Sequence, residues 1–243
     1  MPEGLLLYYI TDRTAFAPDE RTRRLRLLDK IAEAATAGVD YIQLREKDLS
    51  TRDLETLARE AIQVIDNYDD LKDDLKDDLK HDLKTENRAT RTVLLINSRT
   101  DVALSVKANG VHLPANDVSP KEVRTAWHRG YGAGAPARET SPGNPLISIS
   151  CHSAKEVIQA ATNGADLAIL GPIFEKKDAP GTAPAGLKAL RQACRSNIPV
   201  LALGGVTLLN AESCFRAGAA GIAAIRLFQE NNLAEVVHTL RGL

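Results

Sequence analysis

The sequence lacks the features that mark several common functional classes. Its 243 residues carry a formal net charge of −1, which provides no cationic surface for nucleic acid or for an anionic membrane. No apolar stretch approaches the roughly 20 residues that are needed to cross a bilayer. We therefore expect neither nucleic acid nor a membrane as a partner.

Cysteine is scarce as well, with three residues that lie far apart and lack the spacing of a metal site: Cys151, Cys194 and Cys214. Such a pattern predicts free or buried thiols in a reducing compartment. The first residues lack the basic segment, apolar run and small-residue cleavage site of a secretory signal. We interpret the apolar residues 5–10 as a first β-strand, and we expect a soluble cytoplasmic protein.

What the sequence does contain is a regular alternation of short apolar runs with segments of helical period. The runs are nearly continuous, as expected for strands of a parallel sheet that is buried on both faces. They occupy residues 5–10, 39–44, 93–96, 110–113, 146–150, 167–170, 200–203 and 221–225. Glycines that follow helical segments predict left-handed caps at Gly38, Gly164 and Gly218, where the chain turns back into the sheet.

Eight such units of one polarity predict an α/β fold with a single domain, a closed (β/α)8 TIM barrel over residues 1–243. An open doubly wound sheet is the alternative. It is disfavoured because no Gly-x-Gly-x-x-Gly motif opens the first crossover.

Two insertions, at about residues 69–88 and 129–145, exceed a minimal barrel. The first repeats the tetrapeptide Asp-Asp-Leu-Lys, which predicts a solvated, low-complexity extension of the second helix; a helix that binds a partner is the alternative. The second is rich in glycine and proline and predicts a long loop before the fifth strand, at the amino-terminal face of the barrel.

In a parallel barrel the loops after the strands build the active site. The run Gln43-Leu44-Arg45-Glu46-Lys47 ends the second strand with two cations around a carboxylate. Arginine and lysine in this position favour a phosphorylated ligand, because both bind phosphate oxygens. The alternative is a solvated strand end in which Glu46 and Lys47 form a surface pair.

The pair Gly204-Gly205 follows the seventh strand. Glycines at the start of a helix let backbone N–H groups approach an anion, and the loops after strands 7 and 8 of barrels often bind phosphate. We therefore prefer a phosphate site here to a simple tight turn.

Seven segments resemble, in order, motifs of the thiamin phosphate synthase family, which includes a related branch of thiazole tautomerases. They are Tyr9-Ile10-Thr11-Asp12, Gln43-Leu44-Arg45-Glu46-Lys47, Gly110-Val111-His112-Leu113, Ser150-Cys151-His152-Ser153, Gly171-Pro172-Ile173-Phe174, Leu203-Gly204-Gly205-Val206 and Gly218-Ala219-Ala220-Gly221-Ile222. Each motif alone is weak, but together they cover nearly the whole chain apart from the insertions.

The resemblance implies an enzyme of thiamin biosynthesis, a transferase that joins a pyrimidine diphosphate to a thiazole phosphate with the help of Mg²⁺ and releases pyrophosphate. It assigns a role to each matching position: Gln43, Arg45, Lys47 and Asn97 hold the diphosphate, Asp117 binds Mg²⁺, Ser150 faces the ligand, and Gly205, Ile225 and Arg226 cradle the thiazole phosphate. Arg45 and Lys47 are also assigned to the catalytic residues.

Two departures from the synthase pattern leave an alternative open. Ser98 follows Asn97 where synthases of this family carry a second Mg²⁺-binding aspartate. The loop after the sixth strand lacks the Thr-x-Thr-Lys sequence that meets the diphosphate, and only its lysines, of which we choose Lys177, could replace that sequence.

The tautomerase branch lacks both features and needs no cofactor. In that branch the residue that matches His152 transfers the proton, and an imidazole that titrates near neutral pH suits this role. A structural hydrogen-bonding role for His152 is the alternative. A non-catalytic barrel that binds a thiazole phosphate is a third interpretation of the chain, and assembly into a homo-oligomer is left open.

Overall fold

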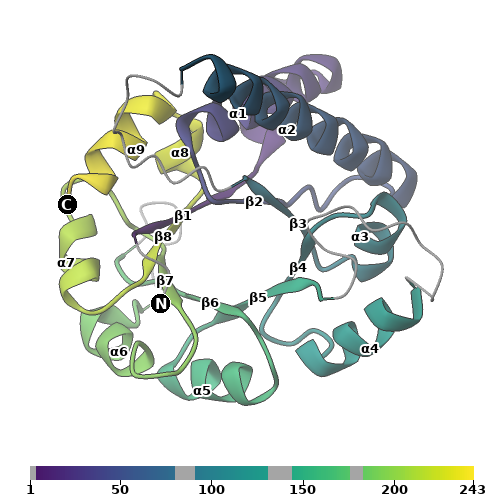
Figure 1. Cartoon of the computed structure of the whole chain (residues 1–243). Coiled ribbons are helices and arrows are strands. Elements are labelled where there is room, and N and C mark those ends of the chain that lie inside the picture. Colours follow the sequence, from purple (N-terminus) through teal and green to yellow (C-terminus); the bar gives the residue numbers. More distant parts are fainter. Residues whose placement is uncertain (1–3, 80–90, 131–143, 176–182) are drawn as a thin grey trace.

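The computed structural model describes residues 4–79, 91–130, 144–175 and 183–243. Its parallel strands close into one barrel in the order of the sequence (Figure 1). The strands are β1 Leu6–Ile10, β2 Tyr41–Leu44, β3 Val93–Asn97, β4 Gly110–Leu113, β5 Leu146–Cys151, β6 Leu167–Leu170, β7 Val200–Leu203 and β8 Gly221–Ala224. The predicted (β/α)8 barrel is confirmed, and the alternative of an open doubly wound sheet is wrong.

Helices surround the barrel on its outside, as Figure 1 shows. They are α1 Glu20–Ala37, α2 Thr51–Leu79, α3 Thr100–Val106, α4 Pro120–Gly130, α5 Ala154–Thr162, α6 Gly186–Ala193, α7 Ala211–Arg216, α8 Arg226–Gln229 and α9 Leu233–Arg241, with a short 3-10 helix, η1, at Arg13–Ala15. No helix within the described ranges combines the length and the apolar character that a membrane span requires.

The helix α2 continues through the first part of the Asp-Asp-Leu-Lys repeat and is described as far as Leu79, so the predicted extension of this helix is confirmed that far. The helix α4 runs to Gly130 and therefore includes the first residues that we had assigned to the second insertion. Residues 80–90 and 131–143, which hold the rest of the two insertions, lie outside the described residues.

Left-handed glycines end helical segments before three strands, as predicted. Gly38, Gly164 and Gly218 have φ angles of 82°, 84° and 98°. After the first two of these turns a carboxylate fixes the start of the sheet: Asp40 accepts a hydrogen bond from the N–H of Leu7, and Asp166 accepts one from the N–H of Ile147, each at 2.8 Å. Local turn chemistry thus sets where strands pair at the amino-terminal face.

Adjacent tyrosines on β1 belong to the two different cores of the molecule, one between the strands and the helices and one inside the barrel. Tyr9 points outward, where its ring centroid lies 6.2 Å from that of Phe228. Tyr8 points into the barrel, where it packs with apolar side chains of β1 itself and of other strands: Leu6, Ile10, Leu95, Leu167, Ile169, Leu201 and Ala223. Polar side chains share this interior with the apolar ones, and they lead from the packed centre to the carboxyl ends of the strands.

Candidate functional site

Two residues predicted to bind the diphosphate meet inside the barrel. Gln43 is 1% exposed, and its Nε2 donates a hydrogen bond to Asn97 Oδ1 at 2.7 Å. Asn97 Nδ2 in turn donates to Ser98 Oγ at 3.1 Å. The Oε1 atom of Gln43 is buried and has no hydrogen-bond partner among the described residues. Because buried polar atoms are almost always paired, this oxygen is suited to accept a hydrogen bond from a ligand.

The carboxylate between the two cations turns away from them. Glu46 is buried and accepts hydrogen bonds from Thr11 Oγ1 at 2.5 Å, from the Arg13 backbone N–H at 3.1 Å and from Arg13 Nη1 at 3.2 Å. The hydroxyl of Thr11 also accepts a hydrogen bond from the backbone N–H of Arg45, at 3.0 Å. The alternative of a surface pair between Glu46 and Lys47 is therefore wrong.

The pairing of Glu46 with Arg13 affects the pKa of both groups. Burial raises the pKa of Glu46, although its hydrogen bonds from Thr11 and Arg13 oppose the shift. Burial lowers the pKa of Arg13, but hydrogen bonds to Asp48, Glu20 and Glu46 outweigh this effect and raise it overall.

The two neighbouring cations are left without such partners. Arg45 is half-buried and Lys47 is exposed. Neither side chain forms an ion pair with any residue in the described ranges. The sequence places both charges at one strand end, and the ion pair of the intervening Glu46 with Arg13 leaves them available for an anionic ligand.

A buried histidine that we did not assign to the site lies at its centre. His112 is 4% exposed, and its Nε2 lies 2.8 Å from the Oγ of Ser150, the residue expected to face the ligand. Its Nδ1 lies 2.9 Å from Ser148 Oγ. Burial and, secondarily, the charge of Arg45 lower the pKa of His112 to about 3, so the imidazole is neutral near pH 7. The available signal was a histidine within the otherwise apolar fourth strand.

The predicted catalytic residue His152 stands apart from this group. Its side chain is exposed, and its Nδ1–H donates to the carbonyl oxygen of Gly171 at 2.8 Å. The backbone N–H of His152 donates to Glu156 Oε2 at 2.7 Å. The described contacts join the histidine to the end of β6 and to α5, not to His112. Its predicted role in proton transfer stays a prediction.

The loop after β7 approaches the loop after β6 closely. Gly204 and Gly205 have φ angles of 89° and 67°, and a Cβ atom on Gly205 would lie 2.7 Å from both the carbonyl oxygen of Glu175 and the Cβ of Phe174. Only glycine fits this position without displacing the backbone. The N–H of Gly205 donates to no residue in the described part of the chain. The exposed Arg226 begins α8 directly after the half-buried Ile225.

The predicted Mg²⁺ ligand lies on the surface of the same face. Asp117 follows β4, is exposed, and accepts a hydrogen bond from the N–H of Val118 at 2.8 Å. Within the described residues, no three histidine, cysteine or acidic side chains gather in a way that could hold a metal ion. Lys177, predicted to meet the diphosphate, lies outside the described residues.

The cysteines offer no nucleophile. All three are free thiols, and burial raises the pKa of Cys151 to about 12 and those of Cys194 and Cys214 to about 11. At neutral pH they are therefore protonated and unreactive. The prediction of free thiols is confirmed.

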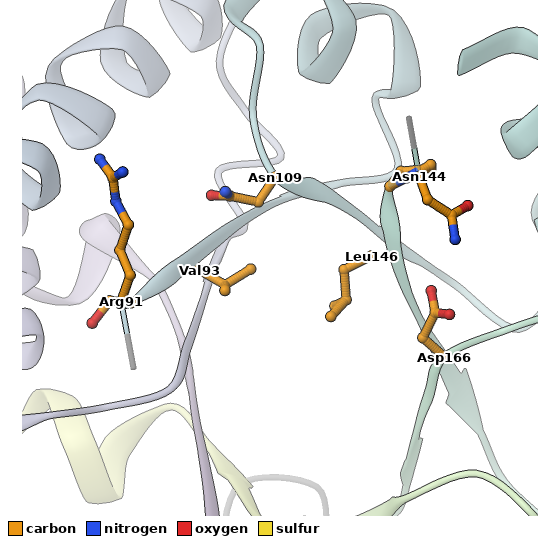
Figure 2. A pocket seen from close by; sticks show the side chains of 8 residues that line it. Arg91, Val93, Asn109, Asn144, Leu146 and Asp166 are labelled. Carbon is orange, nitrogen blue, oxygen red and sulfur yellow. The ribbon is translucent and has the colours of Figure 1, made fainter. Parts of the chain in front are cut away.

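A separate hollow of about 370 Å³ opens at the opposite, amino-terminal face (Figure 2). Its lining comes from the starts of β3 and β5 and from the residues before them and before β4 and β6: Arg91, Thr92, Val93, Asn109, Asn144, Pro145, Leu146 and Asp166. The polar groups that line it have structural partners, as when Asp166 pairs with Arg124 at 2.7 Å. We place the functional site at the carboxyl ends of the strands instead, where the unpaired cations lie.

Fold and site together define a parallel α/β barrel with a candidate site for an anionic ligand at the carboxyl ends of its strands. Comparison with known proteins narrows this class. The family model for thiamine monophosphate synthase matches residues 7–84, 70–135 and 132–228. The chain therefore belongs to the thiamine monophosphate synthase family.

Individual relatives agree with this membership. The chain is 35% identical to a putative thiamine-phosphate synthase 2 of Aquifex aeolicus, over 92% of this chain and 97% of that protein. It is 32% identical to a thiamine-phosphate synthase of Clostridium novyi, over 93% and 91% of the two chains. Among solved structures, a thiamine phosphate pyrophosphorylase from Pyrococcus furiosus superposes with a TM-score of 0.69 at 27% identity, covering 98% of this chain and 94% of that chain.

Proposed function

We propose that this chain is a thiamine-phosphate synthase, a transferase that joins a pyrimidine diphosphate to a thiazole phosphate and releases pyrophosphate. Family membership supports the reaction type. The observation that carries the assignment to this site is the ion pair of Glu46 with Arg13. It leaves Arg45 and Lys47 without an acidic partner among the described residues, directly after the strand whose buried Gln43 contacts the half-buried Asn97.

The diphosphate is the ligand that this group suits best. Arg45 grips phosphate oxygens through its planar guanidinium, and Lys47 adds a compact charge beside it. The donors of Asn97 and Ser150 can complete the set, while the unpaired Oε1 of Gln43 accepts a hydrogen bond from the pyrimidine part. Both cations stabilise the negative charge that grows on the departing pyrophosphate.

The second substrate fits the neighbouring loops. We assign the thiazole phosphate to the N–H groups and charge around Gly205, Ile225 and Arg226, because Gly205 lets the backbone approach an anion and Arg226 is exposed at the same face. The thiazole nitrogen then captures the pyrimidine cation that forms when pyrophosphate leaves. Lys177 would add a further contact to the diphosphate.

Mg²⁺ fits this site only in part. Asp117, the amide oxygen of Asn97 and the hydroxyl of Ser98 are oxygen donors of the kind that Mg²⁺ prefers, but they include a single carboxylate. The bound ion would neutralise charge on the pyrophosphate leaving group. We therefore assign its other ligands to diphosphate oxygens and water, so that the protein binds Mg²⁺ tightly only together with its substrate.

The decisive experiment incubates the purified protein with the pyrimidine diphosphate, the thiazole phosphate and Mg²⁺. Formation of thiamin phosphate and pyrophosphate in equal amounts is the expected result. In parallel, the carboxylated thiazole tautomer is supplied alone. Isomerisation of that compound without any thiamin phosphate in the first reaction would replace this proposal with a tautomerase.

A variant of His152 sharpens the same experiment. His152→Asn keeps a polar side chain of similar size but cannot shuttle a proton near neutral pH. Synthesis should fall only modestly, because capture of a pyrimidine cation needs no base at this position. A proton-transfer role would instead cost about 10²–10⁴-fold in rate, which would contradict the synthase assignment of this residue.

A further inference from the structure

A chain of hydrogen bonds runs through the barrel interior to the candidate site. Tyr8 and Ser148, both completely buried, lie 2.9 Å apart, hydroxyl to hydroxyl. His112 Nδ1 lies 2.9 Å from Ser148 Oγ and 3.4 Å from the Tyr8 hydroxyl. On the other side of the ring, His112 Nε2 lies 2.8 Å from Ser150 Oγ. The described residues offer the hydroxyls of Tyr8 and Ser148 no other partner.

Counting protons decides which ring nitrogen carries the hydrogen. The neutral imidazole has one N–H and one acceptor nitrogen. If Nδ1 held the proton, it could not accept a hydrogen bond from Tyr8 or from Ser148. The two hydroxyl protons would then share the single contact between Tyr8 and Ser148, where only one of them can be donated. One buried donor would remain unpaired, at a cost of about 1–3 kcal/mol.

The other tautomer satisfies every group. Tyr8 donates to Ser148, Ser148 donates to Nδ1 of His112, and the Nε2–H donates to Ser150 Oγ. The proton of Ser150 is then not needed inside the protein. Ser150 is half-buried at the carboxyl end of β5, so this proton is available to a ligand above the barrel.

We infer that Tyr8 and Ser148 are positioning residues which fix His112 as its Nε2–H tautomer and thereby make Ser150 a hydrogen-bond donor to the substrate. With the opposite tautomer, the hydroxyl of Ser150 would donate its hydrogen bond to Nε2 of His112, and Ser150 could only accept hydrogen bonds from the ligand. An anionic phosphate oxygen or a ring nitrogen of the pyrimidine is the kind of acceptor that the donor recognises. The functional half of this inference rests on the proposed synthase reaction.

Either hydroxyl, that of Tyr8 or that of Ser148, can donate to His112 Nδ1 when the other is removed, so the effects of removing them are not additive. In Ser148→Ala the hydroxyl of Tyr8, 3.4 Å away in the wild type, can still donate to Nδ1. In Tyr8→Phe the hydroxyl of Ser148 still does so. Only the double variant removes both donors, so its effect should exceed the sum of the two single effects.

Two measurements test the inference. The ring ¹⁵N shifts of His112, assigned by their loss in His112→Gln, report the tautomer in the ligand-free protein. We expect Nε2–H in the wild type and in both single variants, and a mixture of tautomers in the double variant. The KM for the pyrimidine diphosphate should rise about ten- to a hundredfold in the double variant, as for loss of a hydrogen bond to a charged group, with smaller changes in the single variants.

Tyr9→Phe is the matched control. Tyr9 is buried as completely as Tyr8 and donates one hydrogen bond, to Gln229 Oε1 at 3.0 Å, but on the outer side of the barrel. This variant should leave both the tautomer of His112 and the KM unchanged.

Each outcome is informative. An Nδ1–H tautomer in the wild type overturns the inference without any variant, even if the double variant fails to fold. A double variant that folds but keeps the wild-type KM overturns the role of Ser150 as a donor. If the wild type forms no thiamin phosphate, the proposed function fails, while the tautomer of the wild type still decides the hydrogen-bond order.

Discussion

Arg13 and Glu46 form an ion pair that is almost closed to solvent. Their side chains are 2% and 1% exposed, and Nη1 of the arginine lies 3.2 Å from Oε2 of the glutamate. The pair ties the segment after β1 to the segment after β2, and Thr11 strengthens this link because its hydroxyl contacts both Glu46 and the backbone of Arg45. Thr11 thus holds the backbone of Arg45, while the adjacent carboxylate of Glu46 is paired with Arg13 and not with Arg45.

Glu46→Gln should destabilise the protein by about 2–3 kcal/mol, because the amide group of glutamine would face the donors of the buried Arg13. Asp48 and Glu20 keep the arginine partly paired, which limits the cost. Urea unfolding measures the change in free energy. Glu212→Gln is the matched control, since its partner Arg216 is 75% exposed and such pairs contribute under about 1 kcal/mol. Equal stability of the two variants would contradict the structural role of the buried pair.

Arg45→Ala should weaken binding of the pyrimidine diphosphate about ten- to a hundredfold, because it removes a charge-assisted contact worth about 1.5–3 kcal/mol. Isothermal titration with the unreacted diphosphate measures the Kd directly. Arg129→Ala removes an exposed arginine from the carboxyl end of α4, at the far face of the barrel, and should leave the Kd unchanged. Wild-type affinity in Arg45→Ala would remove this residue from the diphosphate site.

Most of the fold could be predicted from local features of the sequence. Continuous apolar runs mark strands that are buried on both faces, and glycines such as Gly38 mark the turns, because both signals depend on neighbouring residues alone. The family resemblance grouped Gln43 with Asn97 as diphosphate ligands, and the fold brings them into contact because the carboxyl ends of adjacent parallel strands meet at one face.

The electrostatic pairing within the site could not be predicted in the same way. Arg13 and Glu46 are 33 positions apart, and nothing in the local pattern shows that Glu46 pairs with Arg13 rather than with Lys47. The role of His112 depends on which face of β4 points inward and on Ser148 and Ser150 in the neighbouring strand. Side-chain pairs between strands become visible only once the register is known.

Ser98→Asp tests the missing carboxylate. Ser98 has a φ angle of 62°, a conformation that aspartate tolerates better than most residues, so the substitution should preserve the fold. A carboxylate at position 98, in addition to Asp117, should lower the Mg²⁺ concentration that gives half-maximal synthesis. Ser98→Asn is the control, because it adds similar volume without charge. A Mg²⁺ dependence that is identical in wild type, Ser98→Asp and Ser98→Asn would show that position 98 does not contact the ion.

The buried, neutral His112 predicts how stability depends on pH. Its pKa falls from the ordinary 6.5 to about 3 in the folded protein, so between these values the unfolded chain binds a proton that the folded chain does not. The free energy of unfolding must therefore decrease as pH falls through this window and increase as pH rises through it.

His112→Gln should flatten this part of the profile. Between about pH 7.5 and about pH 5.5, the wild type should lose about 1.4 kcal/mol more free energy of unfolding than the variant, because one proton is taken up by the unfolded state alone. Urea titrations at both pH values give the difference, and comparing slopes removes any constant cost of the substitution. His238→Gln changes an exposed histidine of α9 and should follow the wild-type profile. Parallel profiles for the wild type and His112→Gln would mean that the imidazole is protonated inside the barrel, and the hydrogen-bond order from Tyr8 to Ser150 would then be wrong.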